Sequence, residues 1–165
     1  MASASSGGIQ LRSFPKDGCT SDSCVLELLL TLNHSGSWVF RIAFWPDNIS
    51  GETKIVSVTD SGKVKIWTIK NPETSERQVS VHSVDSGAGY SVAWSQDGDM
   101  IVVGGNGSIT VYDPDLKILF RNEDAHAGRV NDVAFSPGGS QIVSGGADGY
   151  LKVWDIPSIA SSDPP

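Results

Sequence analysis

The sequence is poor in cysteine and has no long apolar run. Only two of its 165 residues are cysteines, Cys19 and Cys24, and two thiols do not make a disulfide framework. The first 18 residues, MASASSGGIQLRSFPKDG, lack the apolar segment of a secretory signal. The longest apolar stretch, Val25 to Leu32, contains Glu27 and is far too short to span a bilayer. We therefore expect an intracellular protein, cytoplasmic or nuclear, with no membrane partner.

Basic residues are also scarce. The chain has 12 Lys and Arg against 19 Asp and Glu, which gives a formal net charge of −7. The imbalance lies in the second part, because residues 1–70 carry 7 basic and 6 acidic residues whereas residues 71–165 carry 5 and 13. An acidic surface repels phosphate backbones. We expect no nucleic-acid partner.

What the sequence does have is turn residues and an internal repeat. Eighteen glycines and eight prolines without a collagen-like period indicate short strands joined by tight turns. The segment IVSVTDSGKVKIWTI (55–69) aligns without a gap on IVSGGADGYLKVWDI (142–156) and is identical at seven of fifteen positions. The segment IVVGGNGSITVYD (101–113) joins them after one deletion. The marker residues Trp67, Tyr112 and Trp154 then lie 45 and 42 residues apart.

Two further blocks repeat ahead of each of these segments. One has the pattern apolar, small, aromatic: IAF at 42–44, VAW at 92–94 and VAF at 133–135. The other has the composition of a strand: VLELLLTL at 25–32, ERQVSVHSV at 76–84 and KILFRN at 117–122. Such Val- and Ile-rich runs between turns favour antiparallel strands, and Asn106-Gly107 and Asp148-Gly149 favour tight hairpins. One sheet of this kind cannot bury both faces, so we expect neighbouring sheets to stack.

The third copy, AHAGRVNDVAFSPGGSQIVSGGADGYLKVWD (125–155), has a His before its first strand, an Asp in a turn and a closing Trp-Asp. In these features it resembles a WD repeat. The resemblance implies an all-β fold of WD-type β-propeller blades, with about three four-stranded antiparallel sheets in an incomplete ring. It covers residues 25–156 as three repeats, and the flanking residues are expected to be a flexible leader and tail. The expected bounds are 1–24 for the leader, 25–70, 76–115 and 117–156 for the repeats, and 157–165 for the tail.

The resemblance also implies a buried chain of hydrogen bonds, in which a His links the turn Asp to a strand Ser and then to the Trp indole. In the third copy this chain maps onto His126, Ser144, Asp148 and Trp154. In the first copy it maps onto His34, Ser57 and Trp67, but Ser61 stands where the Asp belongs. In the second copy Val103, Asn106 and Tyr112 replace three of the residues and no His precedes the first strand, so we expect no such chain there.

Three chemical hypotheses fail on the residues themselves. Ser144, His126 and Asp148 have the composition of a nucleophile triad, but a Ser inside a buried strand lacks the accessible Oγ that a triad needs. Cys19, Cys24 and His34 have neither the number nor the spacing of zinc ligands. The stretch VGGNG lacks the Lys-Ser/Thr of a phosphate loop and lies between strands. We expect no enzyme activity, no metal and no cofactor.

A partner-binding face can be proposed from the aligned copies. The alignment places Trp38, Ala88 and Arg129 at one position near the narrow-channel face of the propeller, and Phe40, Tyr90 and Asn131 at another. Because protein interfaces favour aromatic residues and Arg, the sequence predicts a protein–protein interaction scaffold. The candidates are Trp38, Phe40, Tyr90, Arg129 and Asn131. Alternatively, Trp38 and Phe40 pack between blades.

Closing the ring is a problem for this prediction, because such propellers usually need about four to eight blades. The segment 25–32 is expected to be the outer strand of a preceding blade, and the third blade is expected to lack its outer strand. Three interpretations stay open: a truncated product of a longer gene, a chain completed by a second copy or another propeller fragment, and an open arc. The alternative function is therefore that of a fragment of a larger WD-repeat protein, which needs a partner piece or self-association to fold and function.

Overall fold

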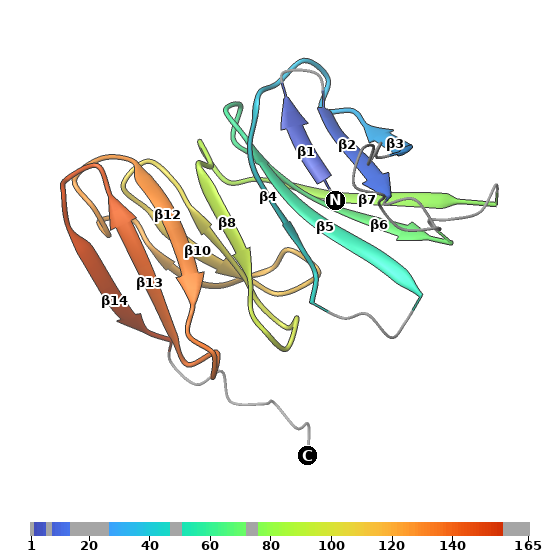
Figure 1. Ribbon diagram of the computed structural model, residues 1–165. Coiled ribbons are helices and arrows are strands. Elements are labelled where there is room, and N and C mark those ends of the chain that lie inside the picture. Colours follow the sequence, from blue (N-terminus) through green and yellow to red (C-terminus); the bar gives the residue numbers. More distant parts are fainter. Residues whose placement is uncertain (1, 6–7, 14–26, 47–50, 72–75, 157–165) are drawn as a thin grey trace, which may run out of the picture.

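The computed structural model describes residues 2–5, 8–13, 27–46, 51–71 and 76–156, and within these ranges the chain is built of strands without helices (Figure 1). The strands form antiparallel sheets that stand side by side in an arc and do not close into a ring (Figure 1). The predicted fold class, all-β blades in an incomplete ring, is confirmed. In the described residues no helix is long and apolar enough to cross a membrane.

Four sheets follow one another along the chain. The first sheet has the order β1-β2-β3, the second β4-β5-β6-β7, the third β8-β9-β10-β11 and the fourth β12-β13-β14. Every hydrogen-bonded pair is antiparallel and follows chain order, so each sheet is a meander. The strands are β1 (Ala2–Ser5), β2 (Gly8–Ser13), β3 (Glu27–Leu32), β4 (Val39–Phe44), β5 (Glu52–Thr59), β6 (Lys63–Lys70), β7 (Gln78–Asp85), β8 (Ser91–Trp94), β9 (Ile101–Gly104), β10 (Ile109–Tyr112), β11 (Ile118–Asn122), β12 (Val130–Phe135), β13 (Gln141–Gly146) and β14 (Leu151–Asp155).

The first sheet departs from the expected flexible leader at 1–24. Its strand β2 buries Ile9 and Leu11, while the intervening Gln10 and Arg12 are partly exposed. This alternation gives β2 one apolar face, which packs with Ile55 in the hydrophobic cluster beside the second sheet. The leader prediction is therefore wrong for residues 8–13. Residues 14–24 and the predicted tail, 157–165, lie outside the described residues, as do both cysteines.

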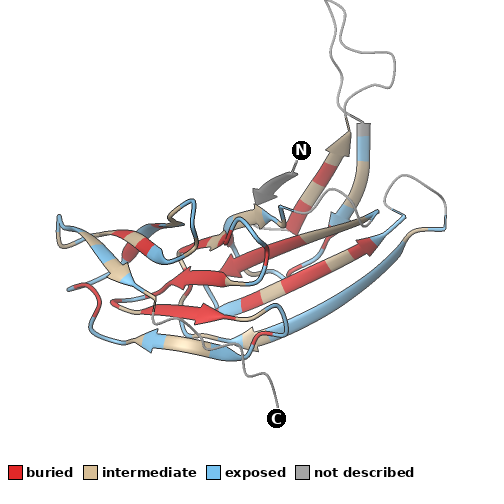
Figure 2. Cartoon of the chain, turned by 90° about the horizontal axis from the view of Figure 1, so that it is seen from below, coloured by how far each residue is buried: buried red, intermediate tan, exposed pale blue. Residues whose placement is uncertain are grey.

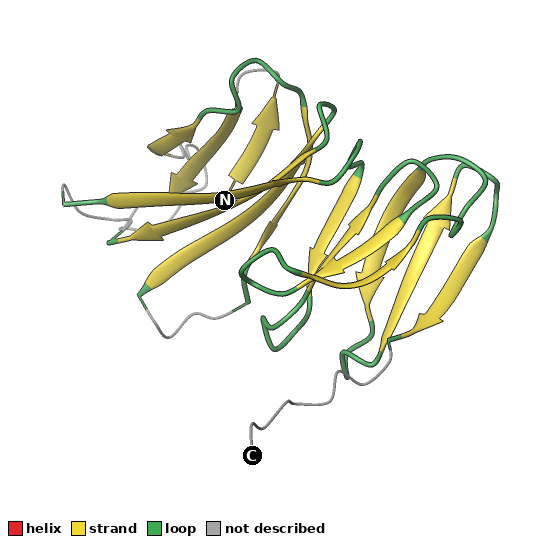
Figure 3. Ribbon diagram, turned by 180° about the vertical axis from the view of Figure 1, so that it is seen from behind, coloured by secondary structure: helices red, strands yellow, loops and turns green. Residues whose placement is uncertain are grey.

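Tight turns join β5 to β6, β9 to β10 and β13 to β14. Gly62, Gly107 and Gly149 each have φ close to +81° at these turns, a conformation that glycine adopts without the steric cost of a Cβ. These turns lie at one end of the sheets, among the loops (Figure 3). They therefore place the same sequence position of each repeat at the same end of the arc.

Apolar residues fill the spaces between neighbouring sheets. One cluster joins the second and third sheets and includes Val64, Ile66 and Val103; another joins the third and fourth and includes Val111 and Ile142. All of these side chains are at most 4% exposed. Buried residues thus run through the middle of the arc, whereas the outer strand β7 is exposed along almost its whole length (Figure 2). Packing between sheets, as the repeat predicts, supplies the hydrophobic core.

Candidate functional site

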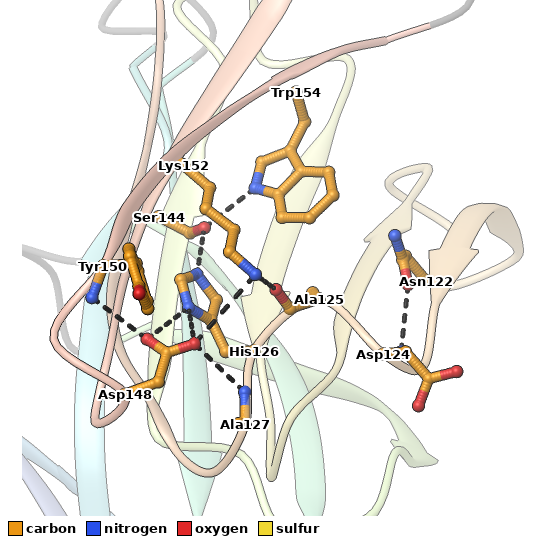
Figure 4. A network of polar contacts seen from close by, with 10 residues as sticks. All are labelled: Asn122, Asp124, Ala125, His126, Ala127, Ser144, Asp148, Tyr150, Lys152 and Trp154. Atoms are coloured by element: carbon orange, nitrogen blue, oxygen red, sulfur yellow. Dashed lines mark hydrogen bonds and ion pairs between the residues drawn. The ribbon is translucent and has the colours of Figure 1, made fainter.

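A chain of hydrogen bonds ties the fourth sheet to the loop before it (Figure 4). His126 Nδ1 lies 2.9 Å from Asp148 Oδ1, and His126 Nε2 lies 2.7 Å from Ser144 Oγ. The indole Nε1 of Trp154 donates to the same Ser144 Oγ over 2.8 Å. Because a carboxylate only accepts and an indole N–H only donates, the His carries its proton on Nδ1 and the Ser hydroxyl donates to Nε2. All four polar groups then have hydrogen-bond partners.

Asp148 also closes the turn in which it lies. Its carboxylate accepts hydrogen bonds from the backbone N–H of Ala127 and of Tyr150, each over 3.1 Å. Burial alone would raise the pKa of Asp148, but the hydrogen bonds from His126 and from these two backbone groups outweigh it and lower the pKa to about 2. Ser144 is 1% exposed and its hydroxyl is already engaged. The geometry suits a structural tie rather than a nucleophile.

The second sheet has a shortened version of this chain. His34 Nε2 lies 2.9 Å from Ser57 Oγ, and Trp67 Nε1 donates to that Oγ over 2.9 Å. At the place of the Asp, the hydroxyls of Thr59 and Ser61 bond to each other over 3.0 Å. The buried Nδ1 of His34 has no hydrogen-bond partner in the described part of the chain. Burial, and secondarily the charge of Lys65, lower the pKa of His34 from 6.5 to about 4.

In the third sheet a serine that the sequence did not suggest takes the place of the histidine. The backbone N–H of Ser86 donates to Gly62 O over 2.8 Å, as that of His126 donates to Gly107 O over 3.0 Å. Burial raises the pKa of the Tyr112 hydroxyl, and hydrogen bonds with Thr110 and Ser86 act against this rise. The loop before β8 (residues 86–90) is shorter than the loop before β12 (residues 123–129). The equivalence of Ser86 and His126 is therefore visible only in the structure.

The inner strands β4 and β12 each carry a β-bulge next to the predicted binding residues. In the second sheet Val39 pairs with Thr59 and Arg41 with Val58, so Phe40 is left as the extra residue. The same shift between Val130 and Asp132 leaves Asn131 extra in the fourth sheet. A bulge re-aims the side chain at its extra residue. In the third sheet Tyr90 and Ser91 likewise both face Gly104, through a backbone hydrogen bond and strand pairing.

These residues meet in a hollow across the three inner strands. The rings of Phe40 and Tyr90 lie 5.4 Å apart, and the guanidinium of Arg129 lies 5.0 Å from the Tyr90 ring centre. Arg129 Nε donates to Asn131 Oδ1 over 2.8 Å. The hollow has a volume of about 200 Å³. We call it the inner-strand hollow, and it is lined by Phe40, Arg41, Tyr90, Arg129 and Asn131.

Comparison with known proteins shows the family of this chain. The family model described as "WD domain, G-beta repeat" matches residues 26–68, 76–113 and 118–155. The chain belongs to the WD-repeat family. Its repeats are of a kind that is typical of protein-interaction scaffolds, and WD-repeat proteins are generally not enzymes.

Several named WD-repeat relatives are similar to this chain. Human WD repeat-containing protein 36 is 29% identical over 113 residues, which cover 67% of this chain and 12% of that protein. The probable cytosolic iron-sulfur protein assembly protein 1 of Vanderwaltozyma polyspora is 26% identical over 113 residues, 61% of this chain and 33% of the relative. The U3 small nucleolar RNA-associated protein 12 of Saccharomyces cerevisiae is 26% identical over 111 residues, which cover 66% of this chain and 11% of that protein. The chain thus spans between about a tenth and a third of their lengths.

Of the five predicted partner-binding residues of this WD-repeat chain, the structure brings four together in the inner-strand hollow. Trp38 does not line the hollow. It is 58% exposed, and its backbone N–H donates to Asp60 Oδ1 over 3.1 Å. Arg41 lines the hollow but was missed by the sequence alignment, because the bulge at Phe40 brings the next residue to the site. All seven residues predicted for the hydrogen-bond chains lie in the two chains described above.

Proposed function

We propose that this WD-repeat chain is a non-enzymatic scaffold that binds other proteins at the inner-strand hollow. The observation that carries the proposal is the gathering of aromatic and Arg side chains from three sheets at one exposed place. Phe40 is 42% exposed and Arg129 is exposed. Residues of this kind contribute most of the binding energy at protein interfaces.

The chemistry of the two His-containing chains supports a non-enzymatic role. Both Ser57 and Ser144 are buried, and each already bonds a His and a Trp. Such a hydroxyl stabilises the sheet and is not free to attack a substrate. The formal net charge of −7 favours protein partners over nucleic acid. The names of two relatives refer to the cytosol and the nucleolus, which supports an intracellular location.

Affinity purification with alanine variants tests the proposal. A tagged chain carrying Tyr90→Ala, Arg129→Ala or Phe40→Ala should recover less of its partners than the unmodified chain, with Tyr90 and Arg129 reducing recovery at least tenfold. Lys117→Ala is the matched control, because Lys117 is exposed on the turn before β11. Thermal unfolding should be unchanged in all four variants. If only variants that unfold the chain, such as Trp154→Ala, reduce recovery, the inner-strand hollow is not the binding site.

A second function, assembly with another propeller blade, is favoured by the face of the fourth sheet. Leu151 and Val153 on β14 are 72% and 61% exposed. In the second sheet the equivalent residues, Val64 and Ile66, are 0% and 4% exposed because the third sheet covers them. The exposed face includes a hollow of about 170 Å³ beside Leu151. Since each equivalent face receives the next WD blade, we propose a blade from a second copy of this chain as the occupant.

Light scattering during size-exclusion chromatography separates this second function from the first. Self-assembly predicts a particle of about 35 kDa or more, at least twice the 17.5 kDa chain. Leu151→Asp should return the chain to a monomer, because a carboxylate on the covered face costs several kcal/mol to bury. Ser140→Asp, on an exposed turn, is the control. A stable 17.5 kDa monomer that unfolds cooperatively would rule out assembly as a requirement for folding.

A further inference from the structure

We infer that the inner-strand hollow recognises an acidic segment of the partner protein, in which an Asp or Glu stands beside an apolar side chain. This inference rests on the proposed scaffold function and adds the chemistry of the partner. It is carried by the arrangement of two arginines and two aromatic rings in one small hollow.

Arg129 is held in a fixed orientation. Its Nε–H donates to Asn131 Oδ1, and its guanidinium carbon lies 5.0 Å from the centre of the Tyr90 ring. The hydrogen bond uses Nε alone, and in the described residues nothing bonds the two terminal amino groups of Arg129. A guanidinium that is already oriented loses little entropy when these amino groups bind the two oxygens of a carboxylate.

Arg41 supplies a second positive charge at the same hollow. Its Nη2 lies 3.8 Å from Asp132 Oδ1, and the two side chains are 53% and 75% exposed. An exposed ion pair at this distance contributes little, so a ligand carboxylate can replace Asp132 as the partner of Arg41. None of the five lining residues is acidic. The hollow is thus a basic place on a chain whose formal net charge is −7.

Size and apolar surface define the rest of the ligand. A volume of about 200 Å³ is smaller than most small-molecule sites, which measure roughly 300–1,000 Å³, and suits one or two side chains of a peptide. Phe40 and Tyr90 present ring surface in this hollow, which favours an apolar side chain next to the acidic one. A nucleic acid fits less well, because its many phosphates would meet the excess of carboxylates on the rest of the chain.

Peptide phage display on the complete chain tests the inference. An unbiased library should yield peptides enriched in Asp or Glu beside Leu, Phe or Tyr. The recovered peptides, made synthetically and labelled with fluorescein, should bind at least tenfold more weakly when Glu is replaced by Gln, and at least tenfold more weakly to the variants Arg129→Gln and Arg129→Lys. The Lys variant keeps the charge but loses the guanidinium fork that can bind both oxygens of a carboxylate. Arg121→Gln, an exposed Arg on the outer strand β11, is the matched control and should bind normally.

The outcomes separate this inference from the proposed function. Peptides that show no acidic enrichment but bind more weakly to Tyr90→Ala would overturn the inference of an acidic ligand. They would leave the proposed scaffold function standing. Peptides that bind equally to Tyr90→Ala and Arg129→Gln would overturn both. A phosphoserine in place of the Glu that tightens binding tenfold or more would show that phosphate, not carboxylate, is the ligand. Unchanged thermal unfolding of every variant excludes a loss of folding as the cause.

Discussion

Burial of His34, whose Nδ1 has no hydrogen-bond partner in the described residues, makes the stability of this protein depend on pH. The pKa of His34 lies at about 4 in the folded chain against 6.5 for an ordinary His. Above pH 6.5 both states are neutral and the stability is complete. As the pH falls below 6.5 the unfolded chain binds a proton that the folded chain cannot bind, so the free energy of unfolding decreases. The loss amounts to about 2 kcal/mol at pH 5 and about 3 kcal/mol below pH 4.

Restoring the missing carboxylate should remove much of this loss. In the fourth sheet Asp148 bonds the equivalent His, and the residue at the place of Thr59 is Gly146. A Cβ at Gly146 would overlap the His126 ring and lie 2.6 Å from Asp148 Oδ1. Thr59 therefore occupies the space that a new Asp needs, and Ser61→Asp alone should fail. The double variant Thr59→Gly, Ser61→Asp should succeed. A hydrogen bond to a charged acceptor contributes about 1.5–3 kcal/mol, reduced by about 1 kcal/mol for the added Gly.

Urea unfolding of the wild type, the single variant and the double variant at pH 7.0, 6.0 and 5.0 checks this prediction. The difference in unfolding free energy between the double variant and the wild type should grow as the pH falls, because the carboxylate raises the pKa of His34. Contributions from other titrating groups cancel in that difference. A difference that is independent of pH, or a single Ser61→Asp variant that behaves like the double, would refute the reasoning.

Two further predictions concern stability. Ser144→Ala leaves His126 Nε2 and the Trp154 indole without partners and should lower the free energy of unfolding by about 1–3 kcal/mol, whereas Ser140→Ala on an exposed turn should have no effect in the same urea titration. Gly98→Ala should destabilise by about 1–3 kcal/mol, because Gly98 has φ +81° and an added Cβ would overlap the Trp45 indole. Gly51→Ala, with φ +69° and open space around it, should cost less, and equal losses for the two would contradict this explanation.

The repeat and its strand segments were predictable, because the alternation of side chains in a strand and the residues of a turn are both visible in short stretches of sequence. Strand β14, for example, follows from the alternating residues after Asp148-Gly149 and ends at the marker Trp-Asp. Strand β2 was missed, because its flanking Ser and Gly residues resemble a disordered leader. The alternation of Ile9 and Leu11 with Gln10 and Arg12 was the signal that could have found it.

The inner-strand hollow was only partly predictable. Alignment of the copies placed Phe40, Tyr90 and Asn131 at one position. In the structure the Phe40 and Tyr90 rings are neighbours, and all three residues line the inner-strand hollow. It did not predict Arg41, because the bulge depends on how β4 pairs with β5 and not on β4 alone. The free Nδ1 of His34 was partly predictable, because Ser61 stands where the Asp partner belongs, but the space that Thr59 fills is defined only in the folded sheet.

Site-specific photo-crosslinking tests most directly whether this chain acts by binding proteins at the inner-strand hollow. A benzoylphenylalanine placed at Phe40 in the intact protein, and irradiated in cells, should form discrete covalent adducts with partner proteins. The same group at Ile118, 53% exposed on the outer strand β11, should give few or none. Adducts from position 118 but not from position 40 would contradict the account.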